Sequence, residues 1–370
     1  MNKYVVILFY LLLFVSCTEK DTHKYEVRGE VQGMDLDGRM VYLTGVEGDS
    51  FINTDSTMIS DNAFVFNGVQ DVPQIMFLRL ANLADEKYIM SLFVLENGDI
   101  KAEIKDSTIF VSGTKMNEQL NSYNAAKNTF LADKLSLNSK YKNSLQAMTR
   151  DIENAFVLQY RNIDKRERKY ITTLIDNNKN NVLGAYLLVT NKHELSNRYK
   201  RDLLKRVGVA FKSYDGIAIL EDEMVNYDKI VEGNIFTDVS LCQIDSSRHN
   251  LSEYVGKGNF LIVNFWASWS VPSVASISEL KDLQKEFRAK GVSVLSISLD
   301  TLYGDWVSAV KQNYLWWPQL SDLKGWKGDA AKTYLVNSIP AFLLFNPDGT
   351  IITTEGDIND IREKLQQLFQ

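Results

Sequence analysis

Two hydroxyl side chains stand three residues apart soon after a nearly continuous apolar stretch. Residues 260–266 (FLIVNFW) are followed by Ser270 and Ser273, with Pro272 between them. A serine acts as a nucleophile only when an adjacent base takes its proton. The nearest histidine in the sequence, His249, precedes the apolar stretch and is expected to lie far from both serines. We therefore assign no catalytic residue here and interpret Ser270 as the cap of a helix N-terminus.

The small number of cysteines limits the redox chemistry that the chain can carry out. The chain has 370 residues and two cysteines, Cys17 and Cys242, which are too few for a disulfide framework. If Cys17 carries a lipid, Cys242 is the remaining thiol and no internal disulfide forms. Its neighbours Gln243 and Asp245 offer no cation that would stabilise a thiolate. We interpret Cys242 as a small, partly buried hydrophobe.

The N-terminus has the pattern of a signal peptide. Lys3 precedes an apolar run over residues 4–15, which is shorter than the ~20 residues that a membrane-spanning helix requires. The run ends in FVSC at residues 14–17, which resembles a bacterial lipobox. We expect a signal peptide over residues 1–16, lipidation of Cys17 and a linker over residues 17–24. The alternative is a cleaved signal peptide with an incidental cysteine.

The apolar stretch that precedes the serines belongs to an alternating series of strands and helices. Residues 260–266 fit a central strand that is covered on both faces. Apolar periodicity predicts a helix over 277–287, a buried strand over 292–298 and a helix around 306–310. A hairpin over 341–353 and a closing helix over 358–368 follow. The order β-α-β-α-β-β-α is that of the thioredoxin fold.

Two motifs support this order. Residues 263–273 (VNFWASWSVPS) resemble the active-site segment of thioredoxins, V-[DN]-F-W-A-x-W-C-x-P-C. They match it at every specified position except the two cysteines, which are Ser270 and Ser273 here. Residues 336–341 (VNSIPA) resemble the loop that carries a cis-proline opposite the redox pair. Residues 236–241 (FTDVSL) resemble the TlpA/ResA-like branch, which is grouped with AhpC/TSA "redoxin" domains.

The resemblance implies a thiol-disulfide chemistry that the serines remove. In this family one thiol attacks as a thiolate and the second resolves the mixed disulfide. Asn264 stands where many thioredoxins have a buried acid, so that candidate base is also missing. The resemblance also implies a cis Ile339–Pro340 bond and a substrate groove. The residues expected to line this groove are Trp269, Pro272, Ile339 and Pro340, with Ser270, Trp269 and Pro340 meeting in it. The alternative for Pro340 is that it only shapes the turn into the following strand.

The part of the chain that precedes this region contains strands first and helices afterwards. Short alternating segments at residues 25–31, 40–43, 63–66, 75–80, 88–95 and 109–111, separated by turn signals, predict an antiparallel β-sandwich over residues 25–116. This segment resembles the N-terminal domain of unknown function found in such envelope lipoproteins. Helical periodicity predicts a helical region over residues 117–232, including helices over 182–189 and 203–211. The thioredoxin-like domain is expected over residues 233–370. The fold class is therefore multidomain, α+β followed by α/β.

Charge and composition exclude some functions. A net charge of −6 argues against a nucleic-acid-binding protein. The basic run over residues 198–206 indicates a solvated helix face, with an interaction patch as the alternative. His193 lies in a polar connector without metal-ligand spacing, and we expect neither a metal ion nor a cofactor.

These observations favour a lipid-anchored protein of the bacterial envelope, on the outer membrane and facing the periplasm. The favoured function is a redox-inactive thioredoxin-fold module that binds an envelope protein or peptide. One alternative is a thiol-disulfide oxidoreductase or thiol peroxidase that uses Cys242 or a partner's thiol. Another is a purely structural thioredoxin fold that supports binding by the N-terminal regions.

Overall fold

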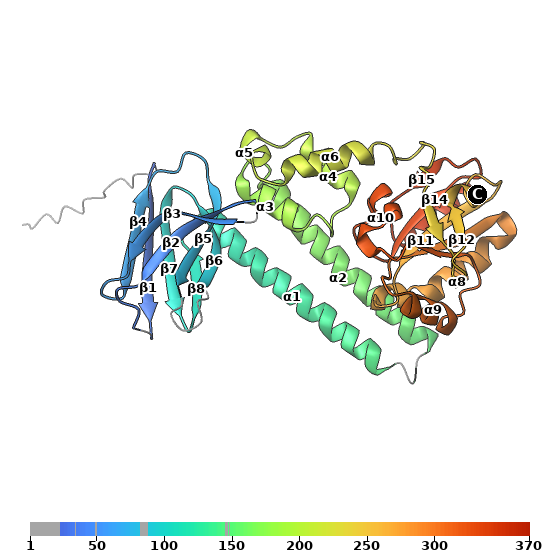
Figure 1. Cartoon of the computed structure of the whole chain (residues 1–370), viewed down its shortest axis with the longest axis horizontal. Coiled ribbons are helices and arrows are strands. Elements are labelled where there is room, and N and C mark those ends of the chain that lie inside the picture. The colour runs from blue at the N-terminus through green and yellow to red at the C-terminus, as the bar shows by residue number, and fades with distance from the viewer. Residues whose placement is uncertain (1–22, 34, 49, 82–87, 145–146, 148) are drawn as a thin grey trace, which may run out of the picture. The chain divides into compact units, whose positions relative to one another are not determined.

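The computed structural model describes residues 23–33, 35–48, 50–81, 88–144, 147 and 149–370. The expected signal peptide, the lipidation of Cys17 and most of the linker lie outside these residues. Contacts divide the chain into two compact units, Met1–Glu118 and Gln119–Gln370, and each is described by itself (Figure 1). The predicted helical and thioredoxin-like regions share the second unit, and the boundary between residues 232 and 233 stays a prediction. No helix in the described ranges is long and apolar enough to cross a membrane.

The first unit is the expected β-sandwich. Within the described residues its two four-stranded sheets have the strand orders β4-β1-β7-β8 and β3-β2-β5-β6. Alternate side chains, such as Val27 in β1 and Leu78 in β5, are completely buried in the core. Neighbouring strands are antiparallel except β1 and β7, which are parallel. The strands are β1 (Tyr25–Gln32), β2 (Met40–Glu47), β3 (Ser50–Met58), β4 (Ala63–Gly68), β5 (Gln74–Ala81), β6 (Tyr88–Leu95), β7 (Gly98–Lys105) and β8 (Thr108–Ser112).

Two of these strands were not expected from the sequence. Strand β3 lies at a sheet edge with nearly every side chain exposed, so its sequence lacks the alternation that marks a half-buried strand. Strand β7 begins at Gly98 and lies between the expected strands over residues 88–95 and 109–111, where we expected turn residues only. Its buried side chains include Ile100 and Ile104. Local turn chemistry was therefore a poor guide at this position.

The helical segment follows. Its elements are α1 (Lys115–Asn143), α2 (Arg150–Asn177), α3 (Val182–Thr190), α4 (Asn197–Leu204), α5 (Val209–Lys212) and α6 (Ile217–Tyr227). The single helix predicted over residues 203–211 is wrong, because α4 ends at Leu204 and Gly208 provides the N-cap of α5. The basic run over residues 198–206 therefore extends beyond the end of α4.

The rest of the second unit has the thioredoxin-like order. As far as the chain is described, its seven-stranded sheet has the order β10-β9-β13-β12-β11-β14-β15, with β11 parallel to β12 and antiparallel to β14. The strands are β9 (Ser240–Cys242), β10 (Arg248–Asn250), β11 (Phe260–Trp266), β12 (Val292–Ser298), β13 (Gln319–Ser321), β14 (Ala341–Phe345) and β15 (Ile351–Thr353). The helices are α7 (Val271–Ala275), α8 (Ile277–Phe287), α9 (Tyr303–Gln312), α10 (Asp329–Thr333) and α11 (Ile358–Leu368).

Helices cover both faces of this sheet. Apolar side chains of α8 and α11, including Leu283 and Leu365, pack with Ile262 of β11 in one buried cluster. Trp306 of α9 packs with Trp266 at the end of β11 in another. Because β11 is buried on both faces, its sequence is continuously apolar instead of alternating, as expected.

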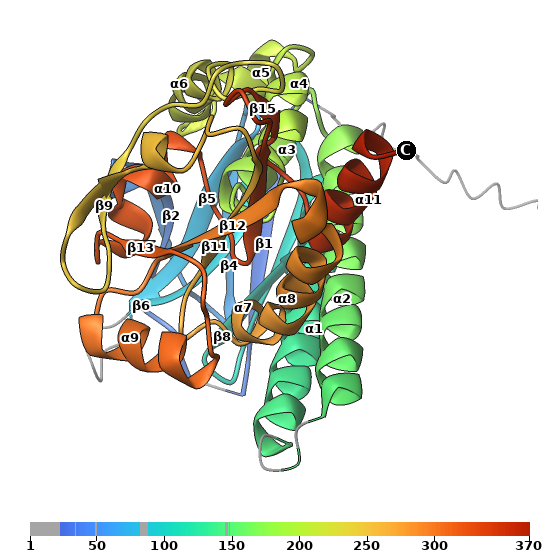
Figure 2. The same ribbon diagram turned by 90° about the vertical axis from the view of Figure 1, so that its right-hand side faces the viewer.

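The helical segment is attached to the thioredoxin-like part through α2. Phe156 of α2 and Tyr141 of α1 share a buried cluster with Ala275 of α7. Figure 2 shows α2 running beside α8, and an ion pair between Arg161 and Glu279 links these two helices. The helix that begins at the two serines is therefore packed against the helical segment.

Candidate functional site

The two serines lie where β11 ends and α7 begins. Ser270 is the N-cap of α7, and its Oγ accepts a hydrogen bond of 3.4 Å from the backbone N–H of Ser273. The hydroxyl of Ser273 donates to Ser270 Oγ at 2.8 Å. Ser270 is 7% exposed and Ser273 is completely buried. The expected capping role of Ser270 is therefore present, and the two hydroxyls are hydrogen-bonded to each other.

A buried carboxylate lies near the serines without contacting them. Asp300 is 1% exposed and accepts hydrogen bonds from Ser268 Oγ at 2.6 Å and from Ser298 Oγ at 2.7 Å. Sequence reasoning missed Asp300. The available signal was its place just after β12, because the carboxyl ends of neighbouring parallel strands meet at one sheet edge. Asp300 stabilises the loop before Ser270 and makes no hydrogen bond with Ser270.

His249 lies at the far edge of the sheet, as expected. It is in β10, and β9, β13 and β12 separate that strand from β11. At about 4.8 Å per strand, His249 lies roughly 19 Å from β11. Its two ring nitrogens contact Glu253 at 2.7 Å and Ser247 at 3.0 Å. It is therefore too far away to accept a proton from Ser270.

Cys242 is also remote from the serines. It lies in β9, three strands and therefore roughly 14 Å from β11, and its thiol is free and half-buried. The sequence neighbours of Cys242 include no nearby cation, but in the structure Arg248 of β10 lies opposite Cys242 in the pairing of β9 with β10. The position of Cys242 prevents it from pairing with a group at residue 270 or 273.

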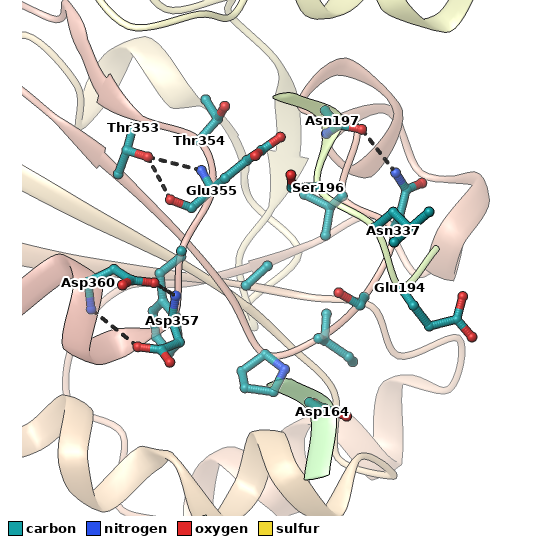
Figure 3. A pocket seen from close by; sticks show the side chains of 18 of the residues that line it. Asp164, Glu194, Ser196, Asn197, Asn337, Thr353, Thr354, Glu355, Asp357 and Asp360 are labelled. Atoms are coloured by element: carbon teal, nitrogen blue, oxygen red, sulfur yellow. Dashed lines mark hydrogen bonds between the residues drawn. The ribbon is translucent and has the colours of Figure 1, made fainter. Parts of the chain in front are cut away.

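The Ile339–Pro340 peptide bond is cis, as expected. This loop lines a cavity of about 810 Å³ together with Pro272. Figure 3 shows the cavity from close by. Three of the four expected groove residues therefore lie at one cavity. The exception is Trp269, which does not line it, is 56% exposed and packs against Trp326.

Ser270 does not line this cavity either. The expectation that Ser270, Trp269 and Pro340 meet in one groove is therefore not met at this cavity. The cavity wall opposite Pro340 comes from α2, the connector before α4, and α4. Sequence reasoning missed this wall, because its residues precede the loop by more than a hundred positions.

Ion pairs organise the α2 side of the cavity. Lys134 contacts Asp164 at 2.6 Å and Glu167 at 2.7 Å, and Lys127 contacts Glu167 at 2.9 Å and Glu194 at 3.2 Å. Burial by itself raises the pKa of Glu167, but hydrogen bonds from Lys134 and Lys127 outweigh it and lower that pKa. Each of the three acids on this side therefore has a lysine partner.

The start of α4 is fixed to the thioredoxin-like part. Glu355 accepts a hydrogen bond of 3.2 Å from the backbone N–H of Arg198, as suits a carboxylate at a helix N-terminus. Burial raises the pKa of Glu355, opposed by backbone hydrogen bonds from Arg198 and Asn197. Asn197 also donates to the carbonyl of Leu335 at 3.2 Å, and Figure 3 shows its contact with Asn337.

One lysine of α4 is completely buried beneath this wall. Lys200 donates from Nζ to the carbonyl of Lys192 at 3.1 Å, and burial lowers its pKa to about 8. Lys200 does not line the cavity. Among the described residues, no group of three His, Cys, Asp or Glu side chains could hold a metal ion.

Comparisons with known proteins agree with this architecture. Residues 233–354 match the AhpC/TSA family, and residues 25–120 match a domain of unknown function, DUF4369. The thiol-disulfide oxidoreductase ResA of Bacillus thuringiensis is 30% identical over 144 residues, which cover 39% of this chain and 77% of that protein. The ResA protein of Oceanobacillus iheyensis is 29% identical over 32% of this chain and 65% of its own length.

A solved structure of a thiol-disulfide oxidoreductase from Bacteroides fragilis is 31% identical, with a TM-score of 0.34, and covers 37% of this chain and 99% of that one. The AhpC/TSA match over residues 233–354 includes the residues that build the sheet around β11 and the loop before β14. Through this C-terminal region the chain belongs to the TlpA/ResA-like branch of the AhpC/TSA thioredoxin-fold family, joined to an N-terminal domain of the DUF4369 type.

Proposed function

We propose that this protein is a lipid-anchored protein of the bacterial envelope whose thioredoxin-like domain binds a partner without exchanging disulfides. The observation that carries the proposal is the hydrogen bond from Ser273 Oγ to Ser270 Oγ at the start of α7. Disulfide exchange needs a thiolate at this position, whereas a hydroxyl without a nearby base keeps its proton. The direct test is a reduction assay on the purified protein, in which we expect no turnover.

The cis-proline loop supports the binding role. Ser338 and Ile339 line the cavity, and their backbone groups make no hydrogen bond within the described ranges of the chain. Unpaired backbone groups of this kind take up an extended peptide through main-chain hydrogen bonds. The proposed partner is therefore an envelope protein or peptide that presents an extended segment.

A second candidate is thiol chemistry at Cys242. It is favoured by the names of the ResA relatives, which are thiol-disulfide oxidoreductases, and by Arg248 opposite Cys242 in the ladder. Only this candidate predicts turnover that disappears in Cys242→Ala.

The anchor has its own test. We predict that Cys17→Ala moves the protein from the membrane fraction to the soluble envelope fraction, because the lipid on Cys17 is the proposed attachment to the membrane. Fractionation of cells that express wild type or variant, followed by a high-salt wash, measures the change. Cys242→Ala serves as the matched control and should stay with the membrane. Retention of Cys17→Ala after the wash would contradict the proposed anchor.

A further inference from the structure

The cavity beside the cis-proline loop has two walls of different character. One wall is the loop itself, with Ile339 and Pro340, and continues to Glu355 after β15. The other wall is formed by α2 and the start of α4. The volume of the cavity, about 810 Å³, lies in the range of about 300–1,000 Å³ that is typical of ligand sites. The cavity is therefore large enough to hold a ligand between the helical segment and the loop.

Nearly all of the acidic side chains in this cavity are satisfied within the protein. Asp164, Glu167 and Glu194 are paired with lysines, Glu355 accepts from the start of α4, and Asp357 caps α11. Asp360 accepts from the backbone N–H of Asp357 in the same capping box. Glu232 at the rim is the one lining acid without such a partner in the described residues.

Two arginines and one histidine on the helical wall lack such partners. The side chains of Arg168 on α2, His193 in the connector and Arg198 on α4 line the cavity and are exposed. In the described ranges, none of the three side chains takes part in an ion pair or hydrogen bond. Unpaired arginines at a concave surface suit carboxylates, because the planar guanidinium can donate two parallel hydrogen bonds.

From this juxtaposition we propose that the cavity binds an extended peptide segment that carries carboxylates. The backbone of the segment lies along Ser338 and Ile339, and its carboxylates contact Arg168, His193 and Arg198. This inference rests on the proposed binding function and adds the chemistry of the partner. It also assigns a role to the helical segment, which supplies Arg168, His193 and Arg198 to the cavity.

Fluorescence anisotropy of labelled peptides on the purified full chain in detergent tests the proposal. Three nonapeptides share their apolar residues and carry aspartate, serine or lysine at alternate positions, each with an amidated C-terminus. A fourth is the serine peptide with a free C-terminal carboxylate. We expect the aspartate peptide to bind at least tenfold more tightly than the lysine peptide, with weaker binding at higher salt. Tighter binding of the fourth peptide than of its amidated form would assign the contact to a chain terminus, and equal binding would assign it to side chains.

Reversing the charges of Arg168 and Arg198 tests whether these side chains contact the peptide's carboxylates. Arg168→Glu with Arg198→Glu should weaken binding of the aspartate peptide by about tenfold or more, because it removes the charge-assisted hydrogen bonds from both guanidinium groups to the carboxylates. Lys179→Glu with Lys205→Glu is the matched control, since both lysines are exposed, lie outside the cavity and change the net charge equally. Arg168→Gln with Arg198→Gln provides a milder variant in case charge reversal beside Glu355 disturbs α4.

The outcomes separate this inference from the proposed function. Equal binding of the aspartate, serine and lysine peptides overturns the acidic specificity and leaves the binding role intact. Unchanged affinity in both arginine variants, or an equal loss in the lysine control, overturns the assigned wall. Failure of every peptide to bind the wild-type protein contradicts the peptide-binding role itself.

Discussion

Replacing Ser270 and Ser273 together by cysteine is expected to give a protein that forms an internal disulfide and reduces a disulfide substrate. The two hydroxyl oxygens are already 2.8 Å apart, so the side chains point toward each other. The thiol at position 270 would lie at the N-terminus of α7, where the helix dipole favours the thiolate. Position 273 is buried behind it and would supply the resolving thiol.

The measurement is a dithiol-coupled reduction assay, with mass determination after alkylation to detect the disulfide. We expect turnover at least tenfold above the wild-type background, because the wild-type site has no thiol. The single variant Ser270→Cys is the matched control: it can form a mixed disulfide but has no partner to resolve it. A double variant that folds and never forms the disulfide would show that restoring the two thiols is not enough to restore a redox-active site.

The second large effect is expected on stability. Phe156→Ala should lower the free energy of unfolding by about 3–5 kcal/mol, because the side chain is buried and its removal leaves a cavity. Phe156 lies 4.4 Å from Tyr141, ring centre to ring centre, and belongs to the cluster that includes Ala275 of α7. The substitution should therefore also loosen α7, which begins next to Ser270.

Urea unfolding followed by circular dichroism measures the stability, and hydrogen exchange of α7 measures the loosening. Leu158→Ala is the matched control on the same helix, since Leu158 is exposed and should change stability by no more than about 0.5 kcal/mol. If both substitutions had the same small effect, the contact between α2 and α7 would not stabilise the second unit as described.

The thioredoxin-like part could be predicted from the sequence where burial is continuous. The apolar run of β11 and the serine cap of α7 were both recognised, because each depends on residues that are adjacent in the chain. Strand β13 was missed, since three residues are too few to show a period. Asp300 was missed for another reason: its contact with Ser268 joins two strand ends that are 32 residues apart.

The cavity could not be predicted at all from local patterns. The unpaired Arg168 and Arg198 lie on two different helices, and the loop that they face is more than a hundred residues away. In the sequence they are part of ordinary charged helix faces. The packing of α2 against α7 and the hydrogen bond from the backbone N–H of Arg198 to Glu355 bring these side chains to the loop with Pro340.

A reduction assay on the wild-type protein tests whether the thioredoxin-like domain functions without thiol exchange. The purified chain is incubated with dithiothreitol and a protein disulfide substrate, and turnover is compared with dithiothreitol alone and with Cys242→Ala. Because Ser270 and Ser273 supply no thiolate and Cys242 lies three strands away, we predict no turnover above dithiothreitol alone for either protein. Robust turnover by the wild type that is lost in Cys242→Ala would show that the protein is a thiol enzyme that uses Cys242.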